Sequence, residues 1–396
     1  MSSKVEAIVK PELLVWARES AGLTLEDAAR KAALKIEKLE SCERGEQRLT
    51  ISQLRSLAKV YKRPLAVFYL PKPPRAFDAL RDFRRLPGEI ESSESPQLRI
   101  EIRRAVYRRK VAVEMFSELG VRPEKLTATA SLTDDPEAVA KHIRHLLPVS
   151  FAQQVGFSSS YDALNRWRAA IESVGVLVFQ AKGIRLEEMR GFSMGETILP
   201  VIVVNRKDLP QGRIFTMFHE FTHLMLRQAG LCDLGEKNKR PEERKVETFC
   251  NKVAGAALVP RDWLLAEQIV SENKVKSAWS DEALALLASR FHVSREVILR
   301  RLLTNNLTTE DFYRRKRDQF QGEYESRQKS EGGFSSPPQE ALSLAGTSFV
   351  QLVLNSYYQE KITSSDVSDF LEVRLRHLPA IEKAVQNRVA EFGAVS

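Results

Sequence analysis

One short stretch of the chain holds the side chains of a metal-dependent hydrolase. The sequence FTMFHEFTHLML at 215–226 contains the pattern His-Glu-x-x-His, formed by His219, Glu220 and His223. Positions four apart lie on one face of a helix, so both histidines can direct a ring nitrogen at one ion. Glu220, one step around the helix, is placed to act on a water molecule as general base. The chain has only six histidines, which makes chance a poor explanation of this pattern.

Zinc is the ion that this pattern indicates, and the site it predicts is catalytic. A structural zinc site normally closes its fourth position with cysteine, whereas a glutamate beside the first histidine is what hydrolysis needs. The residues flanking the motif are apolar nearly all round the helix, which predicts a buried helix and therefore a buried site.

A third protein ligand must come from elsewhere in the chain. The acidic candidates downstream are Asp233, Glu236, Glu242, Glu243 and Glu247. The first four lie in a polar stretch and are expected to be solvated, whereas Glu247 begins a helical segment that is otherwise apolar on one face. A buried carboxylate needs a cationic partner, and zinc is the natural one. The alternative is that Glu247 pairs with an arginine such as Arg213, and Cys250 is a weaker ligand candidate.

Further features surround this motif between residues 170 and 260. The strand-like VIVVN ends in Asn205, RIFTMFHEFTHL follows, and Glu-x-x-x-Asn runs from Glu247 to Asn251 ahead of a small-residue tract closing in Val-Pro. This region resembles the ImmA/IrrE family of zinc metallopeptidases. The resemblance implies that both histidines and this glutamate bind Zn²⁺, and that the protein cuts a transcriptional repressor. The chain departs from the family at Cys250, where alanine is usual, and this bears on substrate contacts.

The N-terminal region carries a motif of a different kind. In ARKAALKIEKLESCERGEQRLT at 29–50, small residues let two helices meet closely at a turn, and the second helix presents one polar face. This segment resembles the lambda-repressor-like (Xre/Cro/C1) helix-turn-helix family, which implies binding to operator DNA. The face that would contact DNA consists of Lys35, Ile36, Glu37, Lys38, Ser41 and Arg44.

This polar face departs from its family in charge. Glutamates at 37, 40, 43 and 46 leave it no better than neutral, and phosphates repel carboxylates. Glutamate can accept a hydrogen bond from cytosine, and Lys38 or Arg44 can hold phosphates, so DNA binding is the expectation. The alternative is a protein-docking or dimerisation module, and a homodimer is compatible with both.

Helical patterns dominate the rest of the chain. Thr24 with Asp27, and Thr50 with Gln53, have the spacing by which an N-cap hydroxyl and a side chain three residues on satisfy backbone donors. A basic helix is expected over 97–119. It either touches nucleic acid or is a solvated face that packs on its apolar side.

Strands are expected only at 174–179 and 198–204, where β-branched residues gather between glycine, proline and asparagine. The predicted fold class is therefore α+β and mostly helical. It comprises an N-terminal five-helix helix-turn-helix domain, a zincin-like metallopeptidase domain with a small sheet, and a helical C-terminal region. The expected bounds are 8–72 for the helix-turn-helix domain, 73–150 for a helical linker region, 151–320 for the metallopeptidase domain, 321–340 for a flexible linker and 341–396 for a C-terminal helical module.

The amino-acid composition is that of an ordinary globular protein and does not point to a special class of protein. The 396 residues are 43% hydrophobic and 29% charged, ordinary values for a globular protein, and a net charge of +9 permits an anionic partner. Cys42, Cys232 and Cys250 are odd in number and widely spaced, which fits a reducing compartment without disulfides. The chain lacks a signal-like start and a long apolar run, so a cytoplasmic protein without a membrane segment is expected.

These patterns together predict a cytoplasmic regulatory zinc endopeptidase joined to a DNA-binding domain. Its cofactor would be Zn²⁺, and its substrate would be a cognate repressor or an operon-encoded toxin or antitoxin partner. The resemblance suggests a mobile-element, stress or toxin–antitoxin setting. The alternative is a DNA-binding transcriptional regulator or antitoxin whose metallopeptidase fold is a sensing module with little or no turnover. The presence of Glu220 favours the enzyme, because a sensor needs no general base.

Overall fold

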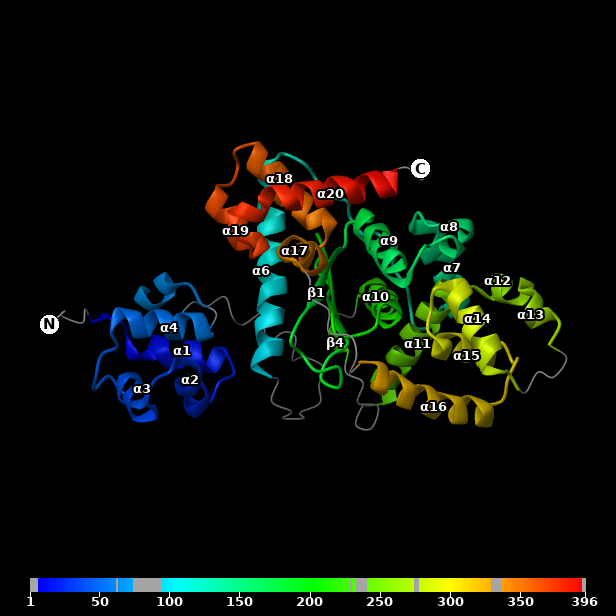
Figure 1. Cartoon of the computed structure of the whole chain (residues 1–396), viewed down its shortest axis with the longest axis horizontal. Helices are drawn as coiled ribbons and strands as arrows, with labels where there is room; N and C mark the ends of the chain where they lie inside the picture. The colour runs from blue at the N-terminus through cyan, green and yellow to red at the C-terminus, as the bar shows by residue number, and fades with distance from the viewer. Residues whose placement is uncertain are drawn as a thin grey trace. The chain divides into compact units, whose positions relative to one another are not determined.

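The protein is mostly helical and contains one small sheet, so the predicted α+β class is confirmed (Figure 1). The computed structural model describes residues 6–61, 63–73, 95–227, 230–232, 241–273, 278–328 and 336–393. The chain divides into two compact units, Met1–Arg104 and Ala105–Ser396, which are treated separately below. Within the described residues, no helix is both long and apolar enough to cross a membrane.

Before residue 96, the described residues of the first unit form four α-helices and a 3-10 helix, where the sequence predicts five helices. These elements are α1 (Pro11–Ser20), α2 (Leu25–Ala32), α3 (Ile36–Glu43), α4 (Ile51–Tyr61) and η1 (Leu65–Tyr69). Two of the helix starts follow the predicted caps. The Thr24 hydroxyl accepts from the backbone N–H of Asp27 at 3.1 Å, and Thr50 and Gln53 cap each other reciprocally.

Helices α2 and α3 form the helix-turn-helix. Ala33 follows α2 with a φ of 54°, a left-handed conformation that turns the chain sharply. The N–H of Leu34 then donates back into α2, which closes the turn, and Lys35 is the N-cap of α3. Buried Leu39 and Cys42 hold α3 on the core of this unit, and this leaves the opposite face of the helix exposed.

The second unit surrounds its sheet with helices, and the boundary between the units falls inside α6. Its helices are α6 (Pro96–Glu118), α7 (Pro136–Leu146), α8 (Phe151–Val155), α9 (Ser160–Ser173), α10 (Pro210–Met225), α11 (Pro241–Leu258), α12 (Arg261–Ala266), α13 (Gln268–Ser271), α14 (Asp281–Phe291), α15 (Arg295–Thr304), α16 (Glu310–Gln328), α17 (Pro337–Ala345), α18 (Thr347–Tyr358), α19 (Ser364–Leu371), η4 (Leu375–His377) and α20 (Leu378–Gly393). Its strands are β1 (Leu177–Ala181), β2 (Gly191–Met194), β3 (Val201–Asn205) and β4 (Gly230–Cys232).

The four described strands are arranged in the order β1-β3-β2-β4. Strands β1 and β3 are parallel, and β2 is antiparallel to both β3 and β4. Both predicted strands are present, each beginning three residues later than expected. The sequence does not predict β2 and β4, because GFSM and GLC are short and contain no β-branched residue.

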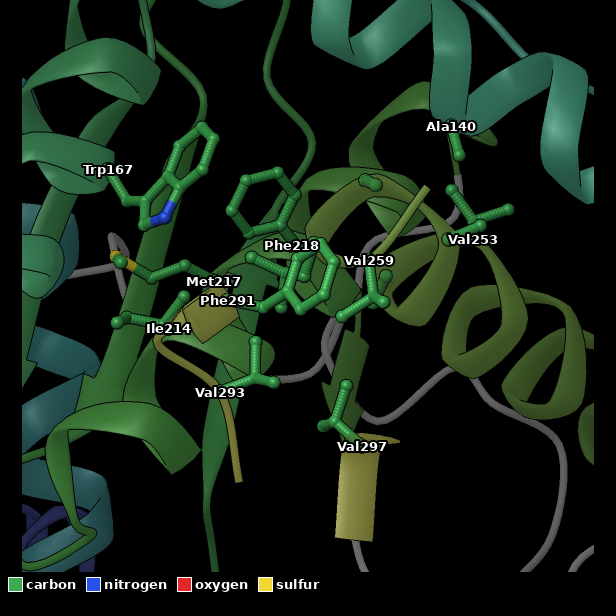
Figure 2. Packing of buried hydrophobic residues seen from close by; sticks show 14 of the residues in the cluster. Ala140, Trp167, Ile214, Met217, Phe218, Val253, Val259, Phe291, Val293 and Val297 are labelled. Carbon is green, nitrogen blue, oxygen red and sulfur yellow. The ribbon is translucent and has the colours of Figure 1, made fainter. Parts of the chain in front are cut away.

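The core of the second unit encloses α10 (Figure 2). Trp167 of α9 stands edge-on to Phe218 of α10, with ring centroids 4.9 Å apart. Val253 of α11 and Phe291 of α14 belong to the same buried cluster. Helix α10 is thus surrounded by apolar side chains, as its nearly all-apolar sequence predicts, and the polar groups it carries are buried with it.

The basic side chains in the second half of α6 are engaged within the second unit. Arg108 is buried, lies 3.5 Å from a carboxylate oxygen of Glu372 and stands over the ring of Phe179. Arg109 donates to the carbonyl oxygens of Ile198 and Leu199 at 2.8 and 3.1 Å. For these residues, packing within the protein is favoured over contact with nucleic acid.

Two parts of the flexible linker predicted over 321–340, residues 321–328 and 337–340, are helical in the structure. Helix α16 continues to Gln328 and α17 begins at Pro337, while 329–335 lie outside the described residues. The tract EYESRQ consists largely of good helix formers, so its polarity alone is no sign of a linker. Pro337 stands in the first turn of α17, where proline is favoured because no intrahelical N–H bond is lost.

Within the second unit, a buried ion pair joins α9 to the C-terminal helices α17 and α18. Arg168 and Glu172 of α9 pair at 3.1 Å, and both side chains are almost fully buried. Arg168 donates to the carbonyl oxygen of Ser343 near the end of α17, and Glu172 accepts from the Ser348 hydroxyl at the start of α18. The two charges thus complement the ends of both helices. A side chain at position 346, between the two helices, would collide with the ion pair, and the residue there is glycine.

Candidate metal centre

Helix α10 is set against the sheet by the loop that precedes it. Asn205, the last residue of β3, donates from Nδ2 to the carbonyl oxygens of Ile184 and Met189 at 3.2 and 2.8 Å. This side chain therefore holds the β1–β2 connection against the end of β3. Pro210 then occupies the first turn of α10, where its fixed φ suits a helix start.

The three side chains that the sequence predicts as ligands converge on one point. The Nε2 atoms of His219 and His223 lie 3.1 Å apart. One carboxylate oxygen of Glu247 lies 3.3 Å from the first of these nitrogens, and the other lies 3.6 Å from the second. Atoms held about 2.0–2.2 Å from a tetrahedral zinc ion are about 3.3–3.6 Å from one another. The donor set therefore fits zinc in both atom type and spacing.

Asn251 orients one of the two histidines. Its Oδ1 lies 3.1 Å from Nδ1 of His219. An amide oxygen can only accept, so Nδ1 carries the proton and Nε2 keeps its lone pair for a metal. Asn251 lies one turn after Glu247 on α11, which gives the Glu-x-x-x-Asn spacing a physical meaning. The glutamate offers a ligand atom, and the asparagine holds a histidine of the neighbouring helix.

The role of Asn251 does not follow from the spacing of residues along the chain alone. The signal that points to it is the general rule that a metal-binding histidine donates its second ring N–H to an oxygen. With α11 expected to lie against the His-Glu-x-x-His helix, a polar residue one turn after the third ligand is the natural place to look for that oxygen.

Glu220 lies beside the converging cluster and does not belong to it. Its side chain is fully buried, and its oxygens are not among the ligand atoms that gather at the histidines. Strand β2 passes next to it: a Cβ added at Gly191 would lie 3.3 Å from Oε1 of Glu220. A carboxylate in this position, adjacent to a metal ligand and held between α10 and β2, suits a general base.

The remaining acidic candidates do not join the cluster. Glu242 is exposed and Glu243 is half-buried, both in the first turn of α11. Asp233 and Glu236 lie outside the described residues. Among the residues that the structure describes, His219, His223 and Glu247 form the group with metal-ligand spacing.

The sequence left two further possibilities open, namely Arg213 as the partner of Glu247 and Cys250 as a weaker ligand candidate. Arg213 donates to Oε1 of Gln180 at 2.7 Å and stands 5.5 Å from the ring of Tyr161, so its partners are on β1 and α9. Cys250 is buried, and its sulfur is not among the described atoms that have metal-ligand spacing.

The predicted DNA face lies on the exposed side and at the ends of α3. Lys35, Ile36, Glu37 and Arg44 are exposed, whereas Lys38 and Ser41 are half-buried. Two of its cations have partners within the protein. Arg44 pairs with Glu40 and Glu46, each at 2.8 Å, and Nζ of Lys38 donates to Gln47 at 2.7 Å.

Both regions match known families. Residues 171–303 match the family described as IrrE N-terminal-like domain, and this stretch includes all three converging side chains and Asn251. Residues 12–67 match the family described as helix-turn-helix domain, which covers α2, α3 and α4. No curated protein matches the chain. The chain therefore carries an N-terminal helix-turn-helix domain followed by an IrrE N-terminal-like domain of the M78 metallopeptidase family.

Proposed function

We propose that this protein is a regulatory zinc endopeptidase with a DNA-binding domain. The observation that supports the proposal most strongly is the convergence of His219, His223 and Glu247 at the spacing of zinc ligands. A sensing site would need the ligands alone. This site also has Glu220 buried directly beside them, and that residue serves catalysis.

The residues of the site divide the work of peptide hydrolysis between them. A bound zinc ion would polarise the peptide carbonyl and lower the pKa of water. Glu220 would accept the proton of the attacking water and return it to the leaving amine. Asn251 would keep His219 in the tautomer that binds metal. The apolar packing around α10 excludes bulk water, which strengthens every charge interaction within the site.

We propose a repressor- or antitoxin-type protein as the substrate, in the cytoplasm. The support is the presence of a helix-turn-helix domain and an IrrE N-terminal-like domain in one chain. The first would hold the peptidase at an operator, close to proteins that act there. We assign the bounds 8–72 to the DNA-binding domain and 151–320 to the peptidase domain.

Replacement of Glu220 by Gln tests the proposal. Gln has nearly the same size and cannot accept the proton, so zinc binding should persist while turnover falls by about a hundred- to ten-thousand-fold. We expect one zinc per chain in the purified variant. Cells that express the wild type should contain new protein N-termini, mapped across the proteome, that are absent from cells expressing the variant.

The control is Glu242→Gln, which removes an exposed carboxylate from the first turn of α11. It should leave both the zinc content and the set of new N-termini unchanged. If wild-type cells and Glu220→Gln cells contain the same N-termini, the protein is not a working peptidase and its zinc fold is a sensing module.

A further inference from the structure

Strand β2 approaches the proposed base more closely than any side chain would allow. A Cβ added at Gly191 would overlap the Cγ2 methyl of Thr216, lie 3.0 Å from the carbonyl oxygen of Val203 and lie 3.3 Å from Oε1 of Glu220. The φ of Gly191 is not in the left-handed region, so its conformation does not require glycine. The glycine is required by space, at the point where the strand meets α10.

Glycine at this position weakens the strand, because it adds no packing and increases the entropy lost on folding. A second unfavourable choice stands on the same face of β2. Ser193 is fully buried, and within the described residues its hydroxyl has no hydrogen-bond partner. The residue opposite it across the ladder is Ile202, a member of the apolar cluster that encloses α10. Two local losses of stability side by side are typical of a surface that serves a site.

We propose that Gly191 is a positioning residue for Glu220. Contact between the bare strand and α10 at Thr216 sets the distance between the helix and the sheet, and thereby the place of the carboxylate relative to the zinc ligands. A methyl group at 191 would press on the Thr216 methyl and displace this turn of α10. The inference rests on the proposed function, since it concerns the geometry of its general base.

The test uses the full-length protein loaded with Co²⁺, whose visible spectrum reports on the metal, titrated with acetohydroxamic acid. This probe chelates the metal and gives its hydroxyl proton to a nearby carboxylate, so its affinity depends on the base without need of the natural substrate. Gly191→Ala should still bind one Co²⁺ per chain and should bind the probe about tenfold or more weakly. Glu220→Gln should weaken the binding of the probe as well.

The effects of Gly191→Ala and Glu220→Gln on the affinity for the probe should not add. If Gly191 acts through Glu220, the double variant should bind the probe no more weakly than the weaker of the two single variants. Thr216→Ser removes the methyl that the new Cβ would overlap, so Gly191→Ala/Thr216→Ser should regain most of the lost affinity. This second variant also covers the case in which Gly191→Ala alone folds poorly.

The matched control is Gly255→Ala in α11, where the nearest atom to a new Cβ would be Cδ of Arg301 at 3.4 Å, an ordinary van der Waals contact. It should bind metal and probe like the wild type. Wild-type affinity in Gly191→Ala, or a loss that adds to that of Glu220→Gln, would overturn the inference. The proposed function fails separately, if the wild type takes up no metal or Glu220→Gln binds the probe unchanged.

Discussion

The metal centre and the polar face of α3 were both recognisable in the sequence, yet the structure treats their side chains in opposite ways. At the metal centre, His219, His223 and Glu247 turn toward one point, which an ion can fill. On α3, Arg44 is already held by Glu40 and Glu46. The metal centre directs its side chains at a ligand, whereas Arg44, a main candidate for a DNA contact, is paired with carboxylates of its own chain.

The difference follows from burial. A histidine in a packed helix has few rotamers open to it, so two histidines four residues apart are forced onto a shared point. An exposed arginine moves among many conformations, and its ion pairs with neighbouring carboxylates contribute little and exchange readily. Pre-arrangement is thus a property of the buried site, whereas the exposed face must exchange its internal partners for phosphates when DNA binds.

The largest effect on the metal centre is expected from Glu247→Ala. Removal of one of three protein ligands should abolish most zinc binding, because the two remaining histidines cannot hold the ion at micromolar concentration. Glu243→Ala, four residues earlier on α11, should keep full occupancy. Metal content per purified chain is the measurement, and stoichiometric zinc in Glu247→Ala would contradict the assignment of the third ligand.

A smaller effect is expected from Asn251→Ala, which removes the acceptor of the His219 ring proton. The histidine would lose its fixed tautomer and orientation, and loss of such a partner typically weakens metal binding about 10- to 100-fold. Asn251→Asp keeps an oxygen at this position and should bind zinc at least as tightly as the wild type. Competition with a chelator of known affinity gives both constants. Equal affinity in Asn251→Ala and the wild type would mean that the contact has no orienting role.

The sequence was most informative where chemistry is encoded within one helix. The spacing of His219, Glu220 and His223 fixes their geometry once α10 forms, and the apolar flanks predict its burial. Glu247 could be selected because a carboxylate on an apolar helix face needs a cation. Gly191 could not be selected in this way, because its role depends on β2 lying against α10. That strand is four residues long and lacks β-branched residues, so no local pattern announces it.

The same limit explains what the sequence missed on α3. The charges of its residues were readable, and the near-neutral balance was predicted from them. Which carboxylate pairs with which cation depends on side-chain positions at the end of the helix, where Arg44 is the C-cap and Glu46 follows in the turn. Sequence spacing places Glu40 and Arg44 as an i, i+4 pair, but it cannot tell whether such an exposed pair forms.

The smallest predicted effect sharpens the comparison from the DNA side. In Glu40→Gln/Glu46→Gln, both carboxylates that hold Arg44 become neutral, so the guanidinium should be released toward phosphates and two repulsive charges should disappear. Affinity for duplex DNA from the protein's own promoter should rise by about three- to tenfold near physiological salt, and the salt dependence should steepen by about one phosphate contact.

The opposite effect is expected from Lys38→Ala/Arg44→Ala, which should weaken DNA binding and flatten its salt dependence. Fluorescence anisotropy of labelled duplex across a salt series measures both the affinity and its salt dependence.

The control, Glu12→Gln/Glu19→Gln, removes the same charge from α1 and separates release of Arg44 from a change in net charge. If the control strengthens binding as much as Glu40→Gln/Glu46→Gln does, Arg44 is not a DNA contact. If Lys38→Ala/Arg44→Ala also binds like the wild type, α3 does not read DNA, and its face serves contact with protein instead.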